Sequence, residues 1–235
     1  MRKVFGMGIA VALVAAVAAF IGLPPRATAQ GGGTIEAEVK YNGAPMVETI
    51  KINKDVEQCG TEKKIGKVSV GPNKGLMNAV VFVADAKGAT TAKAAKPAAL
   101  DQKGCEFRPH VLGMLPGEIE IVNSDGILHY IHTFSTANPT LNKAQPKFKK
   151  VMREKFDKPE IIRVQCDVHS WMLGWIAVMP HPYFGITDDR GVTKIENVPA
   201  GKQTIEAWHP VVGKLRKDVE VKAGQTTKVA FELKK

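Results

Sequence analysis

Aromatic residues, cysteines and long apolar runs are all scarce in this sequence. Aromatic side chains make up 6% of the 235 residues, three residues are cysteines, and a single uncharged run approaches the length of a membrane span. So few cysteines exclude a small disulfide-stapled scaffold, and one run excludes a membrane protein with several spans. The chain is 44% hydrophobic, which is enough for one large or two small domains with a real core.

Several enzyme motifs are also missing. The chain has no C-x-x-C-H for covalent haem, no H-E-x-x-H, no Walker A loop and no G-x-S-x-G turn. A second metal centre of three histidines, as a copper oxidase or nitrite reductase needs, is not evident. The histidines that remain for it are scattered: His110, His132, His181 and His209. We therefore expect a protein that is not an enzyme.

The single uncharged run lies near the N-terminus, over residues 4–23. Arg2 and Lys3 precede it, two prolines end it, and Ala27-Thr28-Ala29 follows. A basic start, an apolar stretch and a small-x-small triplet are typical of a cleaved export signal. We expect residues 1–29 to be a signal peptide and the mature protein to be periplasmic, without stable membrane insertion. The alternative is an uncleaved anchor, since about 20 apolar residues can span a bilayer.

The rest of the chain reads as short strands separated by turns. Ile35, Ala37, Val39 and Tyr41 alternate with polar residues, which is the pattern of a half-buried strand. Further strands are expected at 47–52, 78–84, 118–122, 161–164, 175–179, 192–195, 204–208, 219–221 and 228–233. Short strands with turn residues at this spacing predict an all-β protein of the sandwich or barrel type.

Two segments are ambiguous. Residues 87–99 are rich in alanine and lysine, and we favour a solvated loop over a short helix. Phe148, Met152 and Phe156 recur every four residues, as in an amphipathic helix. Because strands surround this second segment, we expect a loop followed by a strand that ends near Pro159.

One group of residues carries chemistry. Residues 166–172 read Cys-Asp-Val-His-Ser-Trp-Met, and His129 lies upstream, with a predicted strand before each segment. We expect both segments to be loops at strand ends. A thiolate, two imidazoles and a thioether form the donor set of a blue-copper site, in which His₂Cys is trigonal and Met is a weak axial ligand. The sequence therefore predicts one copper ion bound by Cys166, His169, Met172 and a histidine of the upstream segment, either His129 or His132.

The three cysteines allow three pairings, and exported proteins favour disulfides. If Cys166 binds metal, Cys59 with Cys105 is the default bridge. The alternative is that all three thiols are free and buried.

At these residues the chain resembles the cupredoxins, most closely those of the amicyanin type. That type has the same short loop Cys-x-x-His-x-x-Met, here from Cys166 to Met172, with an aromatic residue before the Met. Its first ligand segment maps onto residues 128–133, which makes His129 the ligand and points His132 to the other side. Tyr130 stands where these proteins usually carry an Asn that braces the ligand loop. The resemblance covers about residues 100–179 and implies a Greek-key β-sandwich.

A second resemblance covers the remainder. Residues 187–191, 198–201 and 205–208, preceded by strands at 33–39 and 79–83, look like a carboxypeptidase regulatory-like domain of the transthyretin type. The whole mosaic resembles bacterial methylamine-utilisation or plastocyanin-like proteins. We therefore expect three parts after the signal peptide: residues 30–97 as the first part of a transthyretin-like sandwich, 98–180 as the copper domain, and 181–235 as the rest of that sandwich.

The predicted copper site implies a carrier of single electrons between redox proteins, such as a c-type cytochrome or a dehydrogenase. His169 is expected to reach the surface as the electron port, inside an apolar patch. Seven Lys or Arg residues between 143 and 158 form either a solvated face or a docking patch for an acidic partner. The expected docking residues are Trp171, Leu173, Trp175, Lys149 and Lys150. No nucleic-acid partner is expected. The alternatives are a copper-delivery protein and a structural or ligand-binding β-sandwich.

Overall fold

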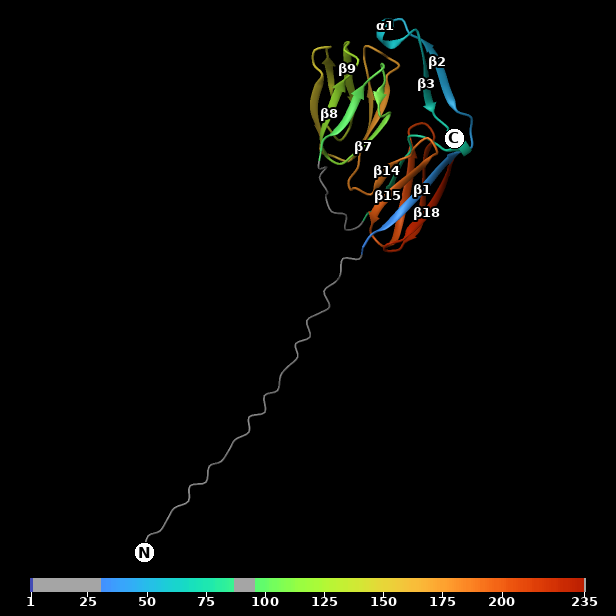
Figure 1. Cartoon of the computed structure of the whole chain (residues 1–235), viewed down its shortest axis with the longest axis vertical. Coiled ribbons are helices and arrows are strands. Elements are labelled where there is room, and N and C mark those ends of the chain that lie inside the picture. Colours follow the sequence, from blue (N-terminus) through green and yellow to red (C-terminus); the bar gives the residue numbers. More distant parts are fainter. Residues whose placement is uncertain (2–30, 87–95, 235) are drawn as a thin grey trace.

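The computed structural model describes residue 1, residues 31–86 and residues 96–234. The expected signal peptide and most of the loop predicted over residues 87–99 therefore lie outside the described residues. The described part is almost entirely β-structure, as predicted, in two β-sandwiches and one projecting arm (Figure 1). None of its helices is long and apolar enough to cross a membrane.

The first sandwich contains the first and the last strand of the described chain. One sheet has the order β15-β1-β18, in which β1 is antiparallel to β15 and parallel to β18. The other has the order β14-β4-β16-β17. The bounds are β1 Gly33–Tyr41, β4 Val80–Val83, β14 Phe184–Ile186, β15 Val192–Val198, β16 Gly201–His209, β17 Gly213–Val221 and β18 Thr226–Leu233. Alternate residues of β1 face a core that includes Ile205 and Phe231.

The second sandwich is built from residues 98–178. Its sheets have the orders β10-β9-β12-β13-β7 and β11-β8-β5-β6. The bounds are β5 Ala98–Gln102, β6 Phe107–Arg108, β7 Val111–Met114, β8 Gly117–Asn123, β9 His129–Phe134, β10 Asn142–Gln145, β11 Val151–Phe156, β12 Glu160–Gln165 and β13 Leu173–Val178. Ile121, Ile131, Phe156 and Ile176 are fully buried between these sheets.

The chain completes the second sandwich between two strands of the first, leaving after β4 and returning at β14. A third apolar cluster joins the two units. It includes Val80 from the first sandwich and Val111 and Ala177 from the second. The rings of Trp175 and Trp208 meet edge-to-face in it, with centroids 5.6 Å apart.

Residues 46–68 belong to neither sandwich and form an arm. Strands β2 (Met46–Lys51) and β3 (Glu62–Val68) pair as an antiparallel hairpin, and the helical turn α1 (Val56–Cys59) lies at its far end. Figure 1 shows the arm running up beside the second sandwich, with α1 at the top. A short 3₁₀ turn, η1 (Pro72–Lys74), follows the arm. The predicted disulfide is present: Cys59 of α1 is bonded to Cys105 of the second sandwich.

Two local expectations have clear outcomes. The basic stretch ends in strand β11, paired with β8 across its whole length, so the prediction of a strand there is confirmed. His129 is the first residue of strand β9 and not part of a loop. The sequence did not predict this strand, because Tyr130 and His132 on its less buried face interrupt any apolar run.

Candidate metal centre

The three nitrogen and sulfur ligands predicted from the sequence come together at one end of the second sandwich. Strands β9 and β12 are antiparallel neighbours, so the start of β9 lies beside the end of β12. This places His129 next to Cys166, which follows β12. A tight turn then brings back His169: the N–H of Met172 donates to the His169 carbonyl at 2.9 Å, and the N–H of Cys166 donates to the Met172 carbonyl at 3.2 Å.

The donor atoms of these residues face one another in a buried space. Cys166 Sγ lies 3.9 Å from His129 Nδ1 and 3.7 Å from His169 Nδ1. The two Nδ1 atoms are 3.0 Å apart. Both histidines are fully buried and Cys166 is 1% exposed. The structure thus gathers His129, Cys166 and His169 into a cluster that could hold a metal ion.

Each imidazole is held from behind by a carboxylate. His129 Nε2 lies 2.9 Å from Asp125 Oδ2, and His169 Nε2 lies 2.8 Å from Asp55 Oδ2. A nitrogen that faces a carboxylate carries the proton, because the carboxylate only accepts hydrogen bonds. The Nδ1 atoms of both rings therefore point into the cluster, where they can hold a proton or a metal ion. Carboxylate–histidine–metal chains of this kind fix the orientation of ligands in metal sites.

The surroundings of Cys166 lower the pKa of its thiol and so favour its ionisation. Burial by itself raises its pKa, but hydrogen bonds from His129, His169 and the backbone N–H of Tyr130 outweigh burial and lower the pKa to about 6. The Tyr130 N–H lies 3.3 Å from the sulfur. Burial likewise lowers the pKa of His129, and its hydrogen bonds to Asp125 and Cys166 raise it to about 9. The centre therefore favours a thiolate, which is the form that binds metal.

The arrangement fits a metal ion. Two imidazole lone pairs 3.0 Å apart and a thiolate beside them repel one another, so a proton or a cation has to lie between them. Bonds of the length found in zinc sites, about 2.0 Å to imidazole nitrogen and about 2.3 Å to thiolate sulfur, allow one ion to reach all three atoms at these separations. Thiolate and imidazole ligands suit both copper and zinc.

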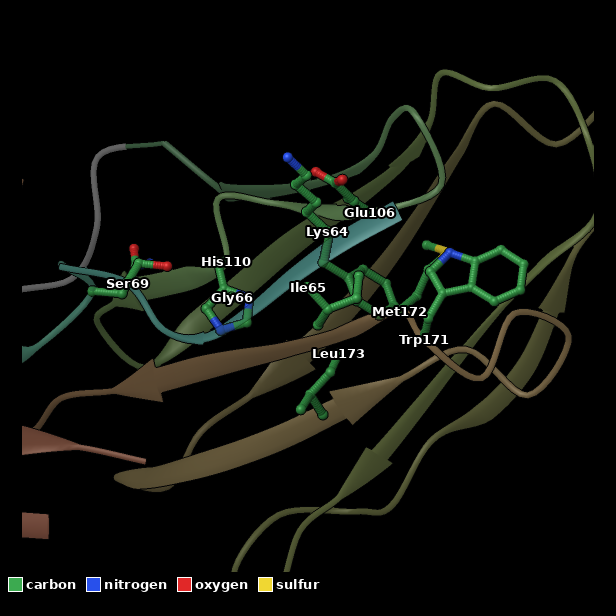
Figure 2. A pocket seen from close by; sticks show the side chains of 11 residues that line it. Lys64, Ile65, Gly66, Ser69, Glu106, His110, Trp171, Met172 and Leu173 are labelled. Carbon is green, nitrogen blue, oxygen red and sulfur yellow. The ribbon is translucent and has the colours of Figure 1, made fainter. Parts of the chain in front are cut away.

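Met172, the fourth predicted ligand, is 1% exposed and packs in the same apolar cluster as Cys166. It also lines a cavity of about 180 Å³ between the ligand turn and arm strand β3. Figure 2 shows β3 crossing this cavity, with His110 at one end and Trp171 at the other. The ring of Trp171 is tilted against His169 at 5.1 Å between centroids, and its Nε1 donates to the Cys105 carbonyl at 3.1 Å.

The predicted docking residues lie in different places. Trp171 and Leu173 are half-buried beneath the arm, where both line the cavity. Trp175 packs against Trp208 at the junction of the sandwiches and does not surround His169. Lys149 and Lys150 are both exposed. They lie at the ligand end, because the N–H of Asn123 at the end of β8 donates to the Lys150 carbonyl at 2.8 Å.

The expected exposure of His169 is corrected. The side chain is fully buried and does not reach the surface, because Asp55 of the arm lies against its Nε2 atom. His132 lies on the opposite face of β9 from His129, as the resemblance implied. It pairs with Asp167 at 2.9 Å and is partly exposed.

Sequence reasoning missed both carboxylates. Asp125 lies four residues before His129 in a turn-forming Asn-Ser-Asp-Gly segment, so an acid placed just ahead of the first ligand was a usable signal. Its carboxylate also accepts the backbone N–H of Cys105 at 2.8 Å, which fixes its position. Asp55 lies 114 residues before His169, and no local pattern marks it.

The lowered pKa of Cys166 gives a direct prediction for the metal-free protein. The ultraviolet absorbance of the thiolate should rise with pH around a midpoint of about 6, because Cys166 is the only free cysteine in the described chain and is hydrogen-bonded by both histidines. Replacing His129 by glutamine should raise the midpoint. A midpoint near that of an ordinary thiol, about 8.5, in the unsubstituted protein would contradict the described geometry.

No protein-family model and no curated protein matches the chain. Among solved structures, a copper-containing nitrite reductase from Thermus scotoductus is 28% identical over 38% of this chain, with a TM-score of 0.31, and the match covers 24% of the reductase. A purple cupredoxin from Nitrosopumilus maritimus is 15% identical over 34% of this chain and 98% of its own, with a TM-score of 0.30. A Cu(I) amicyanin variant is 14% identical over 42% of this chain and 97% of its own, with a TM-score of 0.32.

The similar structures are thus cupredoxins, matched over part of this chain with low scores. They do not support the resemblance of the first sandwich to a transthyretin-type domain. What the structure shows of the first sandwich is its two sheets, with the strand orders given above.

Proposed function

We propose that this protein binds one copper ion through His129, Cys166 and His169, with Met172 as the fourth ligand, and carries single electrons between redox proteins in the periplasm. The observation that carries the proposal is the buried set of one thiolate and two inward-facing Nδ1 atoms within 3.0–3.9 Å of one another. When bound, copper supplies a one-electron couple. The protein acts as a carrier and not as an enzyme.

The chain's own residues keep this centre rigid. Asp125 and Asp55 hold the two imidazoles, and the backbone N–H of Tyr130 holds the sulfur. Because the ligands sit on strand ends and in a hydrogen-bonded turn, we expect their positions to change little with the charge of the ion. Little rearrangement is then needed when an electron arrives or leaves, which favours rapid transfer. The Cys59–Cys105 disulfide supports an oxidising compartment.

A second candidate is copper binding for delivery, without electron transfer. The observation behind it is the burial of His169, which removes the electron port expected of a carrier. The two functions differ in colour. A carrier loaded with Cu(II) should hold one ion per chain and absorb strongly in the visible through its copper–thiolate bond. A delivery protein should bind Cu(I) and stay colourless, and a structural sandwich should retain no copper.

The proposed partner is an acidic redox protein, steered by the lysines at the ligand end. Lys143, Arg153 and Lys155 are neutralised by Glu154, Glu120 and Asp157. Among the described residues, Lys149 and Lys150 have no such ion pair, and Phe148 beside them is 81% exposed. An apolar tip among free positive charges fits a partner whose docking face is apolar with an acidic rim.

This steering predicts a rate effect. Reversing Lys149 and Lys150 to Glu should slow electron transfer to an acidic c-type cytochrome about 10-fold at low salt and flatten its salt dependence. Stopped-flow rates at rising ionic strength measure both, because exposed charges are screened beyond about 8 Å at physiological salt. Lys202→Glu with Lys222→Glu is the matched control, with the same charge change on the first sandwich. Equal slowing by both pairs would reduce the basic run to a solvated face.

A further inference from the structure

The helical turn of the arm converges on the metal centre through three residues. Asp55 bonds His169, as described above. Gln58 Nε2 lies 3.4 Å from Oδ1 of Asp125, the carboxylate that holds His129. Cys59 is covalently joined to Cys105, whose N–H also bonds Asp125. A segment from outside the second sandwich therefore reaches the supports of both imidazoles.

The Asp55 carboxylate contacts His169 and does not cap the helical turn that it precedes. Asp55 is the N-cap residue of α1, where an aspartate normally accepts a hydrogen bond from the first turn of its own helix. Here its side chain makes no capping bond. Its backbone lies in the left-handed region, with φ 50° and ψ 40°, which is uncommon for residues other than glycine, although aspartate adopts it more often than most. The turn thus lacks a side-chain cap while the carboxylate holds the imidazole.

The same contact closes one side of the centre. His169 is fully buried, while the Asp55 side chain is 36% exposed, so the carboxylate forms the layer between the imidazole and solvent. A protein that approaches from this side meets the arm and not the ligand. The exposed lysines and Phe148 lie on the loop beside the His129 support instead.

We propose that Asp55 is a positioning residue of the metal centre, and that the arm closes the His169 side so that partners exchange electrons at the end that carries Phe148, Lys149 and Lys150. The proposal rests on the proposed function in requiring a bound metal. Asp55 fixes the Nε2–H form of His169, which keeps the Nδ1 lone pair for the ion. Its negative charge also stabilises Cu(II) more than Cu(I), because the oxidised ion carries the larger positive charge.

Replacing Asp55 by asparagine should lower the Cu(II) affinity about 10-fold or more, as loss of such partners does in other metal sites. It should lower the Cu(I) affinity less, and so shift the reduction potential upward. Chelator competition for each oxidation state and a redox titration measure these effects. Glu57→Gln is the matched control, because it removes the same charge from the same turn at a residue with no contact to a ligand. Asp55→Glu should restore part of the affinity.

The outcomes separate cleanly. If Asp55→Asn and Glu57→Gln shift affinity and potential equally, Asp55 acts only through its charge and the positioning role is overturned. If the unsubstituted protein binds copper without a visible band, the proposed function fails. The Cu(I) and Cu(II) affinities of the variants then still decide the role of Asp55.

The closed side is tested by single charge reversals. Lys54 is exposed on the arm beside Asp55, and Lys149 is exposed on the loop beside the His129 support. The proposal expects Lys149→Glu to slow transfer to an acidic cytochrome several-fold at low salt and Lys54→Glu to leave the rate unchanged, with both variants keeping the visible spectrum. Slowing by Lys54→Glu that equals or exceeds that of Lys149→Glu would place the partner on the arm and overturn the closure.

Discussion

Replacing Cys166 by alanine is expected to abolish the visible absorption of the copper-loaded protein. The thiolate is the only sulfur anion in the centre, and two histidines and the Tyr130 N–H are arranged to stabilise it. Its loss should reduce Cu(II) affinity by more than the roughly 10–100-fold that changes behind a ligand produce. Copper stoichiometry and the visible spectrum measure the effect.

The neighbouring Ser170 provides the control for this substitution. It lies in the same turn, is exposed, and offers no contact to the cluster in the described structure. Ser170→Ala should therefore keep both the copper and the absorption band. A band that survives in Cys166→Ala would show that the sulfur ligand has been assigned to the wrong residue.

Removing the disulfide, by Cys59→Ser with Cys105→Ser, is expected to destabilise the protein by about 4 kcal/mol. The bridge closes a segment of 46 residues, and releasing it restores that much conformational freedom to the unfolded chain. The arm also loses its covalent link to the second sandwich, so the copper affinity should fall as well. Denaturant unfolding of both proteins gives the change in free energy.

The expected loss of copper affinity in the double cysteine variant has its own control. Adding Asp55→Asn to the double cysteine variant should lower copper affinity by less than it does in the parent, because the arm no longer holds Asp55 against His169.

A destabilisation below about 1 kcal/mol on removal of the disulfide, smaller than the 2–5 kcal/mol usual for native disulfides, would show that the bridge contributes little to the fold.

The strands with clear alternation were predictable from sequence, and those with mixed character were not. β1, β8 and β18 carry regular apolar positions that their burial follows. β3 contains three lysines and β10 is exposed at three of its four positions, so neither presents a buried apolar row to recognise. β5 begins at Ala98, next to an alanine- and lysine-rich stretch that resembles a loop.

The residues of the metal centre also differ in whether the sequence alone could predict them. Cys166, His169 and Met172 lie within seven residues, so their spacing alone revealed them. The position of His129 followed from the resemblance. The arm was included in the first sandwich because the resemblance assigned residues 30–97 to that sandwich as a whole, and strand β3 was not predicted. Its contact with His169 depends on tertiary structure across 114 residues.

The ligand turn is braced in a way that the sequence resemblance did not imply. Tyr130 occupies the position at which amicyanin-type proteins usually carry a bracing Asn, and its backbone N–H lies 3.3 Å from the Cys166 sulfur. The loop is braced instead from outside the sandwich by Asp55 on His169, and from within by Trp171 on the Cys105 carbonyl.

A redox titration of the copper-loaded protein, followed by visible absorption, tests the assignment of a one-electron copper centre most directly. One copper ion per chain should give an intense visible band that disappears on one-electron reduction and returns on oxidation, with a single reversible midpoint. Copper that binds only as colourless Cu(I), or a band that does not return after a reductive cycle, would contradict it.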